Sequence, residues 1–198
     1  MESYRGKEKI SVNETCLKNG LIEHCAPTLA GMKCAGLFNY FYCEGQKVRE
    51  EMEELNQLLN DKGVSVDALV WKENSVLVYV YRRGMLEKEL RSRGVSEFLK
   101  TYGYASCEVE ASLKCLKARM RQSSCFPHEI GIFLGYPLED VCGFIANGGK
   151  NCKSCGMWKV YCRKEEKERL FKKFRKCKEV YMQVFFEGRE LKQMTVRT

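Results

Sequence analysis

The segment VLVYVY, residues 76–81, consists only of valine, leucine and tyrosine. β-Branched and aromatic residues favour strands, so this segment predicts a central strand of a sheet. The residues around Lys72-Glu73-Asn74-Ser75 predict a turn that joins it to an earlier strand beginning at Asp67. The short aromatic-rich segments LFNYFYC (37–43) and MWKVYC (157–162) predict two further strands.

Helical periodicity is strongest between Gln46 and Asn60, where an apolar residue recurs every three or four positions. Comparable patterns, with glycine and proline at their ends, predict further helices over 84–91, 95–102, 108–121, 127–134, 137–146 and 164–186. Residues 20–36 are rich in small residues, glycine and proline, and we expect a turn-rich loop or a broken element there.

About four strands among six or seven helices, without regular βαβ alternation, predict an α+β fold. We expect a small, mostly antiparallel sheet of about four strands, packed by several helices in a single compact domain. We expect a polar lead-in over residues 1–15, a domain over 16–186 and a tail over 187–198. The domain should end in a basic helix over 164–186.

The chain has 198 residues and a net charge of +8, and residues 163–178 contain nine basic and three acidic side chains. This basic stretch predicts either an ordinary solvated helix face or weak contact with nucleic acid or an acidic protein. No apolar run approaches the roughly 18 residues of a membrane span, so no membrane partner is expected. The 12 cysteines and the lack of an apolar signal segment before Glu14 favour a cytoplasmic protein with free thiols.

His24 and Cys25 precede Pro27, a residue that often opens a helix. If a helix begins there, its positive end would stabilise a thiolate at Cys25, which is both a nucleophile and a metal ligand. His24 would supply a base or a second ligand. The alternative is a turn that contains a buried thiol and a hydrogen-bonded histidine.

The second candidate is His128-Glu129, which follows Pro127 and contains the other of the two histidines. Its imidazole suits metal binding or general-base work, and the alternative is a pair of side chains that cap a helix. Glu139 and Asp140 follow Pro137, and we expect them only to satisfy backbone NH groups in the first turn of a helix.

Cys152-Lys153-Ser154-Cys155-Gly156 has the CxxC spacing of a zinc knuckle and also that of a redox pair. A structural zinc needs two more ligands, and no second CxxC follows. The two thiols of Cys152 and Cys155 therefore form a knuckle, a redox pair or neither.

The segments HCAPTLAGMK (24–33), FPHEIGIFLGYPLEDVCGFI (126–145) and CGMWKVY (155–161) resemble an uncharacterised family of anaerobic Gram-positive bacteria. This is number 3793 in the domain-of-unknown-function series. The resemblance implies a bacterial cytosolic protein that forms one compact unit, and it implies no known reaction.

From these motifs we expect an uncharacterised cytosolic protein with a Cys/His site for a transition metal, zinc or iron, or for a metal-containing cofactor. Its metal ligands would be His24, Cys25, His128 and Cys155. The alternatives are a non-catalytic interaction protein, a nucleic-acid-binding protein that uses residues 163–178, and an acyl-transfer or hydrolytic enzyme. In the enzyme, Cys25 would be the nucleophile and His128 would take its proton.

Overall fold

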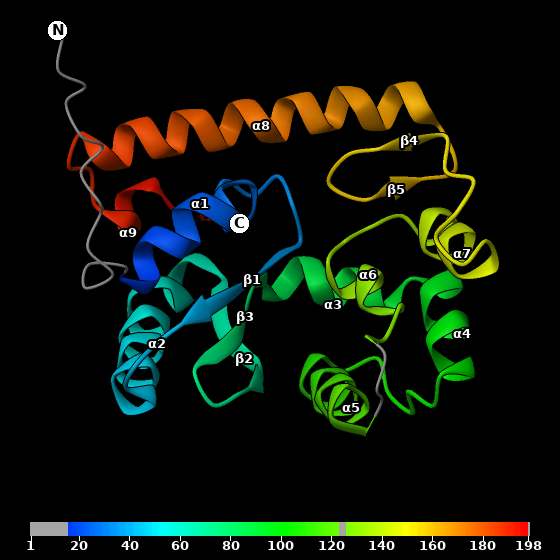
Figure 1. Cartoon of the computed structure of the whole chain (residues 1–198), viewed down its shortest axis with the longest axis horizontal. Helices are drawn as coiled ribbons and strands as arrows, with labels where there is room; N and C mark the ends of the chain where they lie inside the picture. The colour runs from blue at the N-terminus through cyan, green and yellow to red at the C-terminus, as the bar shows by residue number, and fades with distance from the viewer. Residues whose placement is uncertain (1–15, 123–125, 198) are drawn as a thin grey trace, which may run out of the picture.

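The computed structural model describes residues 16–122 and 126–197, so the predicted lead-in over 1–15 lies outside the described residues. The fold is α+β, as predicted. Its elements are α1 (Leu17–Leu29), β1 (Ala35–Phe41), α2 (Gly45–Leu59), the 3-10 turn η2 (Asn60–Lys62), β2 (Val64–Trp71), β3 (Ser75–Arg82), α3 (Arg83–Arg91), α4 (Arg93–Thr101), α5 (Val109–Gln122), α6 (Ile130–Phe133), α7 (Leu138–Ala146), β4 (Ser154–Cys155), β5 (Lys159–Val160), α8 (Lys164–Phe186) and α9 (Leu191–Met194) (Figure 1).

The main sheet has three antiparallel strands in the order β1-β3-β2, which confirms the prediction of a central strand over residues 76–81. Side chains alternate between the two faces of a strand. Val76, Val78 and Val80 of β3 therefore enter one hydrophobic core, and Tyr79 and Tyr81 enter the other.

Helices cover both faces of this sheet. The valine face packs against α1, α2 and α9, and the tyrosine face packs against α3 to α7. The long helix α8 crosses the molecule above α1 and the β4–β5 hairpin (Figure 1). None of the helices within 16–122 and 126–197 is long and apolar enough to cross a membrane.

The strand predicted over 157–162 is not part of the main sheet. Only Lys159 and Val160 are in strand conformation, and they pair with Ser154 and Cys155 in a separate two-stranded hairpin. The hairpin forms a third small core with Phe171 and Phe174 of α8.

The prediction of a loop or a broken element over residues 20–36 is wrong for its first half, where α1 is continuous. Leu17, Leu21, Ile22, Cys25 and Leu29 recur at helical spacing and are buried. Burial of this face stabilises the helix although its last turn contains a proline.

The C-terminal segment, expected as a tail outside the domain, belongs to the fold. Leu191 and Met194 of α9 are buried in the core around α1. The fully buried Arg82 donates hydrogen bonds of 2.5 Å to the Leu29 carbonyl and 2.8 Å to the Val196 carbonyl. The domain therefore extends past residue 186.

Candidate functional site

A cavity of about 280 Å³ lies between α7, the β4–β5 hairpin and the segment that precedes α6. We call it the aromatic pocket, because its wall consists mainly of the rings of Phe126, His128, Tyr136, Phe144 and Trp158. Its volume is near the lower end of the range for small-molecule sites.

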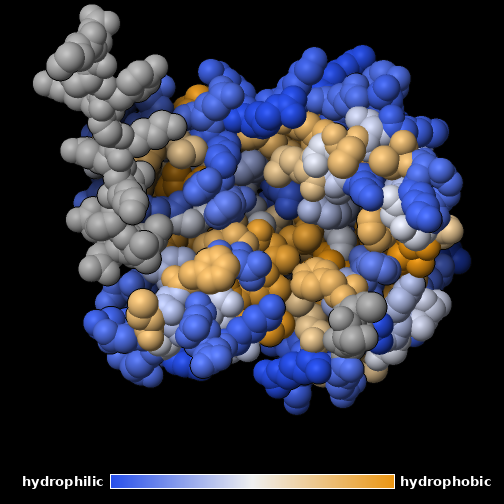
Figure 2. Space-filling model, in the orientation of Figure 1, coloured by the Kyte–Doolittle hydropathy of each residue, from blue (hydrophilic) through white to orange (hydrophobic). Residues whose placement is uncertain are grey.

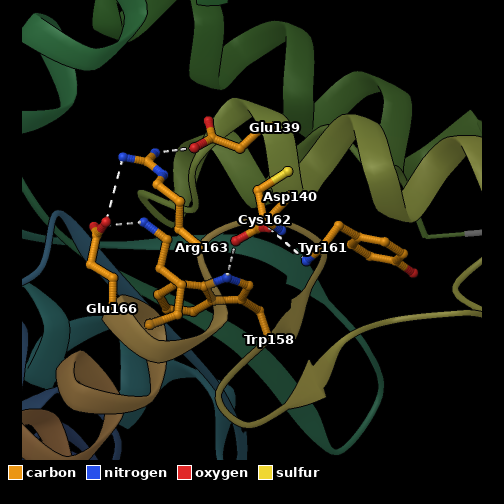
Figure 3. Close-up of polar contacts among 8 residues, drawn as sticks. Glu139, Asp140, Trp158, Tyr161, Cys162, Arg163 and Glu166 are labelled. Atoms are coloured by element: carbon orange, nitrogen blue, oxygen red, sulfur yellow. Dashed lines mark hydrogen bonds and ion pairs between the residues drawn. The ribbon is translucent and has the colours of Figure 1, made fainter.

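Asp140, in the first turn of α7, holds Trp158 in this wall (Figure 3). The Oδ2 atom of this buried carboxylate accepts a hydrogen bond of 2.9 Å from the indole Nε1 of Trp158. Its Oδ1 atom accepts from the backbone NH groups of Tyr161, at 2.8 Å, and Cys162, at 3.0 Å. The prediction that Asp140 serves only the start of its own helix is therefore wrong: it joins α7 to the chain that follows β5.

Two further rings restrain the indole. Tyr136 stacks on Trp158 with ring centroids 4.6 Å apart, and Phe171 of α8 meets it edge-on at 4.5 Å. Gly156 permits this approach, because a Cβ atom at that position would collide with the Phe171 ring. One wall of the pocket is therefore positioned by contacts within the protein itself.

The junction between α7 and α8 is also held by charge. Glu139 forms an ion pair with Arg163, whose guanidinium also lies 3.6 Å from the carboxylate of Glu166 (Figure 3). These side chains are more than one-third exposed, so each pair adds less stability than the buried Asp140 contacts.

His128 lies at the mouth of the aromatic pocket and meets the ring of Phe144 edge-on at 5.1 Å. Its neighbour Glu129 is buried and caps no backbone group. It accepts hydrogen bonds from Arg119 and, at 3.3 Å, from the Tyr104 hydroxyl. The predicted helix over 127–134 is shorter in the structure and begins at Ile130, so His128 precedes it.

The side-chain nitrogens of two lysines lie over rings of the aromatic pocket. The Nζ atom of Lys159 is 5.8 Å from the centroid of Phe144, and that of Lys33 is 5.2 Å from the centroid of Tyr136. The Asp140 carboxylate that also lines the pocket is already engaged by three NH donors. A ligand with an acidic group in this pocket would therefore meet the positive charge of Lys159.

A second cavity, of about 430 Å³, lies beneath α8 and between the α1–β1 connection and α3. We call it the lysine cavity, after Lys33. Met32, Met85 and Phe174 supply apolar lining, and Glu89 supplies a carboxyl group. Figure 2 shows hydrophobic surface in the central hollow below α8. Trp158 lines both cavities.

Burial sets the ionisation of the groups beside the lysine cavity. It lowers the pKa of the Lys33 amine to about 8, since removal from water disfavours the charged form. It raises the pKa values of the Cys25 and Cys34 thiols to about 12. Burial also raises the pKa of the Glu89 carboxyl.

The structure does not bring together the four predicted metal ligands. His24 is exposed on α1 and stacks on Phe38 at 5.2 Å, and Cys25 is buried behind β1. Of the four, only His128 lines the aromatic pocket. Within 16–122 and 126–197, no three His, Cys, Asp or Glu side chains form a group that could hold a metal ion.

The prediction that Pro27 opens a helix is wrong. Pro27 lies in the last turn of α1, where its carbonyl accepts from the NH groups of Met32 and Lys33. Cys25 therefore lies near the negative end of a helix rather than the positive one, and both this position and its burial disfavour a thiolate. The proposed pairing of Cys25 with His128 as nucleophile and base gains no support from these positions.

The CxxC segment forms the hairpin that carries Trp158. Lys153 NH donates to the Val160 carbonyl at 2.8 Å, and Gly156 NH donates to the Trp158 carbonyl at 3.1 Å. Cys152 and Cys155 are both free thiols. The spacing suits a tight turn, and the redox pair stays a prediction.

The basic face of α8 is partly neutralised, since Lys176 pairs with Glu179 and Lys178 with Glu23. Lys167, in contrast, is buried and lies 3.3 Å from Glu166. Exposed basic side chains with no ion pair among the described residues are Lys164, Arg169, Lys172, Lys173 and Arg175. Contact of these residues with nucleic acid or an acidic protein stays a prediction.

Sequence reasoning missed Lys33, Tyr136 and Phe144 as site residues. The segments used for the family resemblance contain all three, but no periodicity shows that Lys33 is buried or that the rings converge. Lys33 follows the end of α1 and Gly31, and nothing in this stretch of sequence distinguishes a buried lysine from an exposed one.

A family model described as "Protein of unknown function (DUF3793)" matches residues 21–195 of the chain. No curated protein and no solved structure matches this chain.

Proposed function

The chain belongs to the DUF3793 family of proteins of unknown function, and we propose that it binds a flat aromatic small molecule with an acidic group in the aromatic pocket. The observation that carries the proposal is the ring-lined cavity whose Trp158 is held by buried Asp140. Such a preformed apolar cavity with a few polar groups is typical of small-molecule sites.

Exposed apolar side chains at the mouth support the same proposal. Phe126 is 49% exposed and Met157 is 42% exposed, and both line the pocket. Exposed apolar surface beside an apolar cavity is unfavourable in water, and a bound ligand would cover it. Lys159 would contact the acidic group of the ligand, and the rings would contact its aromatic body.

The test uses the Trp71→Phe variant, which leaves Trp158 as the sole tryptophan. Its indole NH resonance is followed by NMR during titration with naphthalene-2-carboxylate and with the neutral naphthalene-2-carboxamide. We expect a saturable shift with both probes. Lys159→Gln should weaken binding of the carboxylate about two- to fivefold, the effect of losing one ion pair, and leave binding of the amide unchanged.

Lys153→Gln is the matched control, because Lys153 lies on the same hairpin and does not line the pocket. Phe144→Leu should weaken both probes, since it removes part of the ring-lined wall. An indole resonance that moves with neither probe contradicts the proposal, as does equal loss of binding in the two lysine variants.

We also propose a second candidate function, the binding of a metal-containing cofactor with His128 as its protein ligand. A flat ring system with a central zinc or iron ion could lie in the aromatic pocket and take the His128 imidazole as a ligand. The two histidines provide a matched test, because His24 lies outside the pocket. Protein purified without oxygen should then contain near-stoichiometric metal that His128→Ala loses and His24→Ala retains; metal-free wild-type protein contradicts this second proposal.

We also propose that the protein works in a reducing bacterial cytosol. Supporting this, all eleven cysteines in the described ranges are free thiols.

A further inference from the structure

The lysine cavity contains a buried amine that the proposed binding function does not use as a reactant. The Lys33 residue is only 8% exposed. Its Nζ donates a hydrogen bond to the Ala35 carbonyl, and no carboxylate of the described residues lies within ion-pair distance of it. Buried lysines are usually paired with a carboxylate, so an unpaired one beside a cavity is unusual.

The neighbours of Lys33 do not supply the missing negative charge. The titratable groups that interact with it electrostatically are the thiols of Cys25 and Cys34, which stay protonated near neutral pH because burial raises their pKa values. With no counter-ion among the described residues, burial lowers the pKa of Lys33 and raises the fraction of neutral amine near neutral pH, and the neutral amine is the nucleophilic form.

We propose that Lys33 is a nucleophilic amine that forms an imine with a small aldehyde or ketone entering the lysine cavity. The cavity has a volume of about 430 Å³, and its apolar side chains suit the body of such a compound. This site is separate from the aromatic pocket, although Trp158 lines both.

The reaction balances without an external oxidant or reductant. The Nζ lone pair attacks the carbonyl carbon, a C–N bond forms, and the carbonyl oxygen takes up a proton to give a carbinolamine. The carbinolamine then loses its oxygen as water and its remaining N–H proton, which leaves a C=N bond. Glu89 lines the same cavity and supplies the proton for the departing water, a role that its raised pKa favours.

The test is reductive trapping of the full-length protein with benzaldehyde and sodium cyanoborohydride near neutral pH, followed by peptide mass mapping. Lys88 is the internal comparison, because it lines the same cavity but is exposed. We expect Lys33 to be alkylated about tenfold faster than Lys88 or more, because a lower pKa leaves more neutral amine at this pH.

Three further measurements separate the cavity effect from intrinsic reactivity. In urea-unfolded wild-type protein, the alkylation rates at Lys33 and Lys88 should become equal. This comparison does not depend on whether any variant folds. Lys153→Arg, at an exposed lysine that lines neither cavity, should leave the rate at Lys33 unchanged, and Lys33→Arg should remove the fast phase. The proposal is overturned if Lys33 reacts no faster than Lys88 in the folded protein, or if its advantage persists in urea.

Discussion

The indole nitrogen of Trp158 and the buried carboxylate of Asp140 are joined by a hydrogen bond of 2.9 Å across the edge of the aromatic pocket. The same carboxylate accepts from two backbone NH groups in the chain that leads into α8. One side chain therefore connects α7 to the hairpin and to the residues between β5 and α8, and it holds Trp158 in the wall of the pocket.

Replacing Asp140 with asparagine should destabilise the fold by about 2–3 kcal/mol. The amide of asparagine presents a donor to at least one of the three NH groups that the carboxylate now accepts from, so a buried donor is left without a partner. Urea unfolding followed by far-UV circular dichroism measures the change. Glu139→Gln is the control and should cost less than about 1 kcal/mol, because its ion pair with Arg163 is solvent-exposed; equal losses in the two variants would contradict the anchoring role.

The Lys33→Met variant should show a distinctive pH dependence of stability. The folded-state pKa of Lys33, about 8, is below its usual value of 10.5, so between these values the unfolded chain binds more protons and wild-type stability rises with pH. The stability advantage of Lys33→Met over wild type should therefore shrink by about 3 kcal/mol from pH 8 to pH 10.5. Urea unfolding across this range measures it, and a difference that does not vary with pH argues against a buried amine.

Alkylation of the cysteines should follow burial. Cys25 and Cys34 are buried thiols with raised pKa values, whereas Cys43 and Cys155 are exposed. Iodoacetamide near neutral pH should modify the exposed pair first and the buried pair only after unfolding, since the thiolate is the reactive form. Mass mapping over time shows the order. Rapid modification of folded Cys25 would revive the hypothesis of a cysteine nucleophile.

Leu191→Ala should destabilise the protein by about 2–4 kcal/mol, because it opens a cavity in the core between α9 and α1. Phe186→Ala is the matched control at the end of α8. Its side chain is 76% exposed, so its loss should change stability by less than about 0.5 kcal/mol. Thermal unfolding compares the two, and a Leu191 variant as stable as wild type would mean that the C-terminal segment lies outside the cooperative fold.

Periodicity was a good guide wherever one face of an element is buried along its whole length. Val48, Met52, Leu55 and Leu59 define the buried face of α2, and the bounds of α8 agree with the prediction. The same signal fails at α1, because Gly20 and Pro27, which commonly mark turns, both lie within the helix. It also fails at the C-terminus, where α9 is too short to show a period.

The candidate site was harder to predict, because a residue type suggests chemistry only when its neighbours are known. Cys25 and His128 were predicted as a pair, yet Cys25 is buried in the core around α1, and His128 lies beside Phe144. The position of Asp140 after Pro137 predicts only a helix-start role, because its acceptor role depends on Trp158, 18 positions later. Sequence proximity to Pro137 offered the wrong explanation.

The amino-acid sequence alone determined the α+β class, the central strand over 76–81 and most of the long helices, because local periodicity and turn residues report directly on backbone conformation. Tertiary structure decided which side chains meet. It buried Lys33 with no carboxylate partner among the described residues, and it brought five rings together around one cavity. Burial and long-range contacts determine the pKa values of the buried side chains and the shapes of the two cavities. No local stretch of the sequence shows which residues will be buried or in contact.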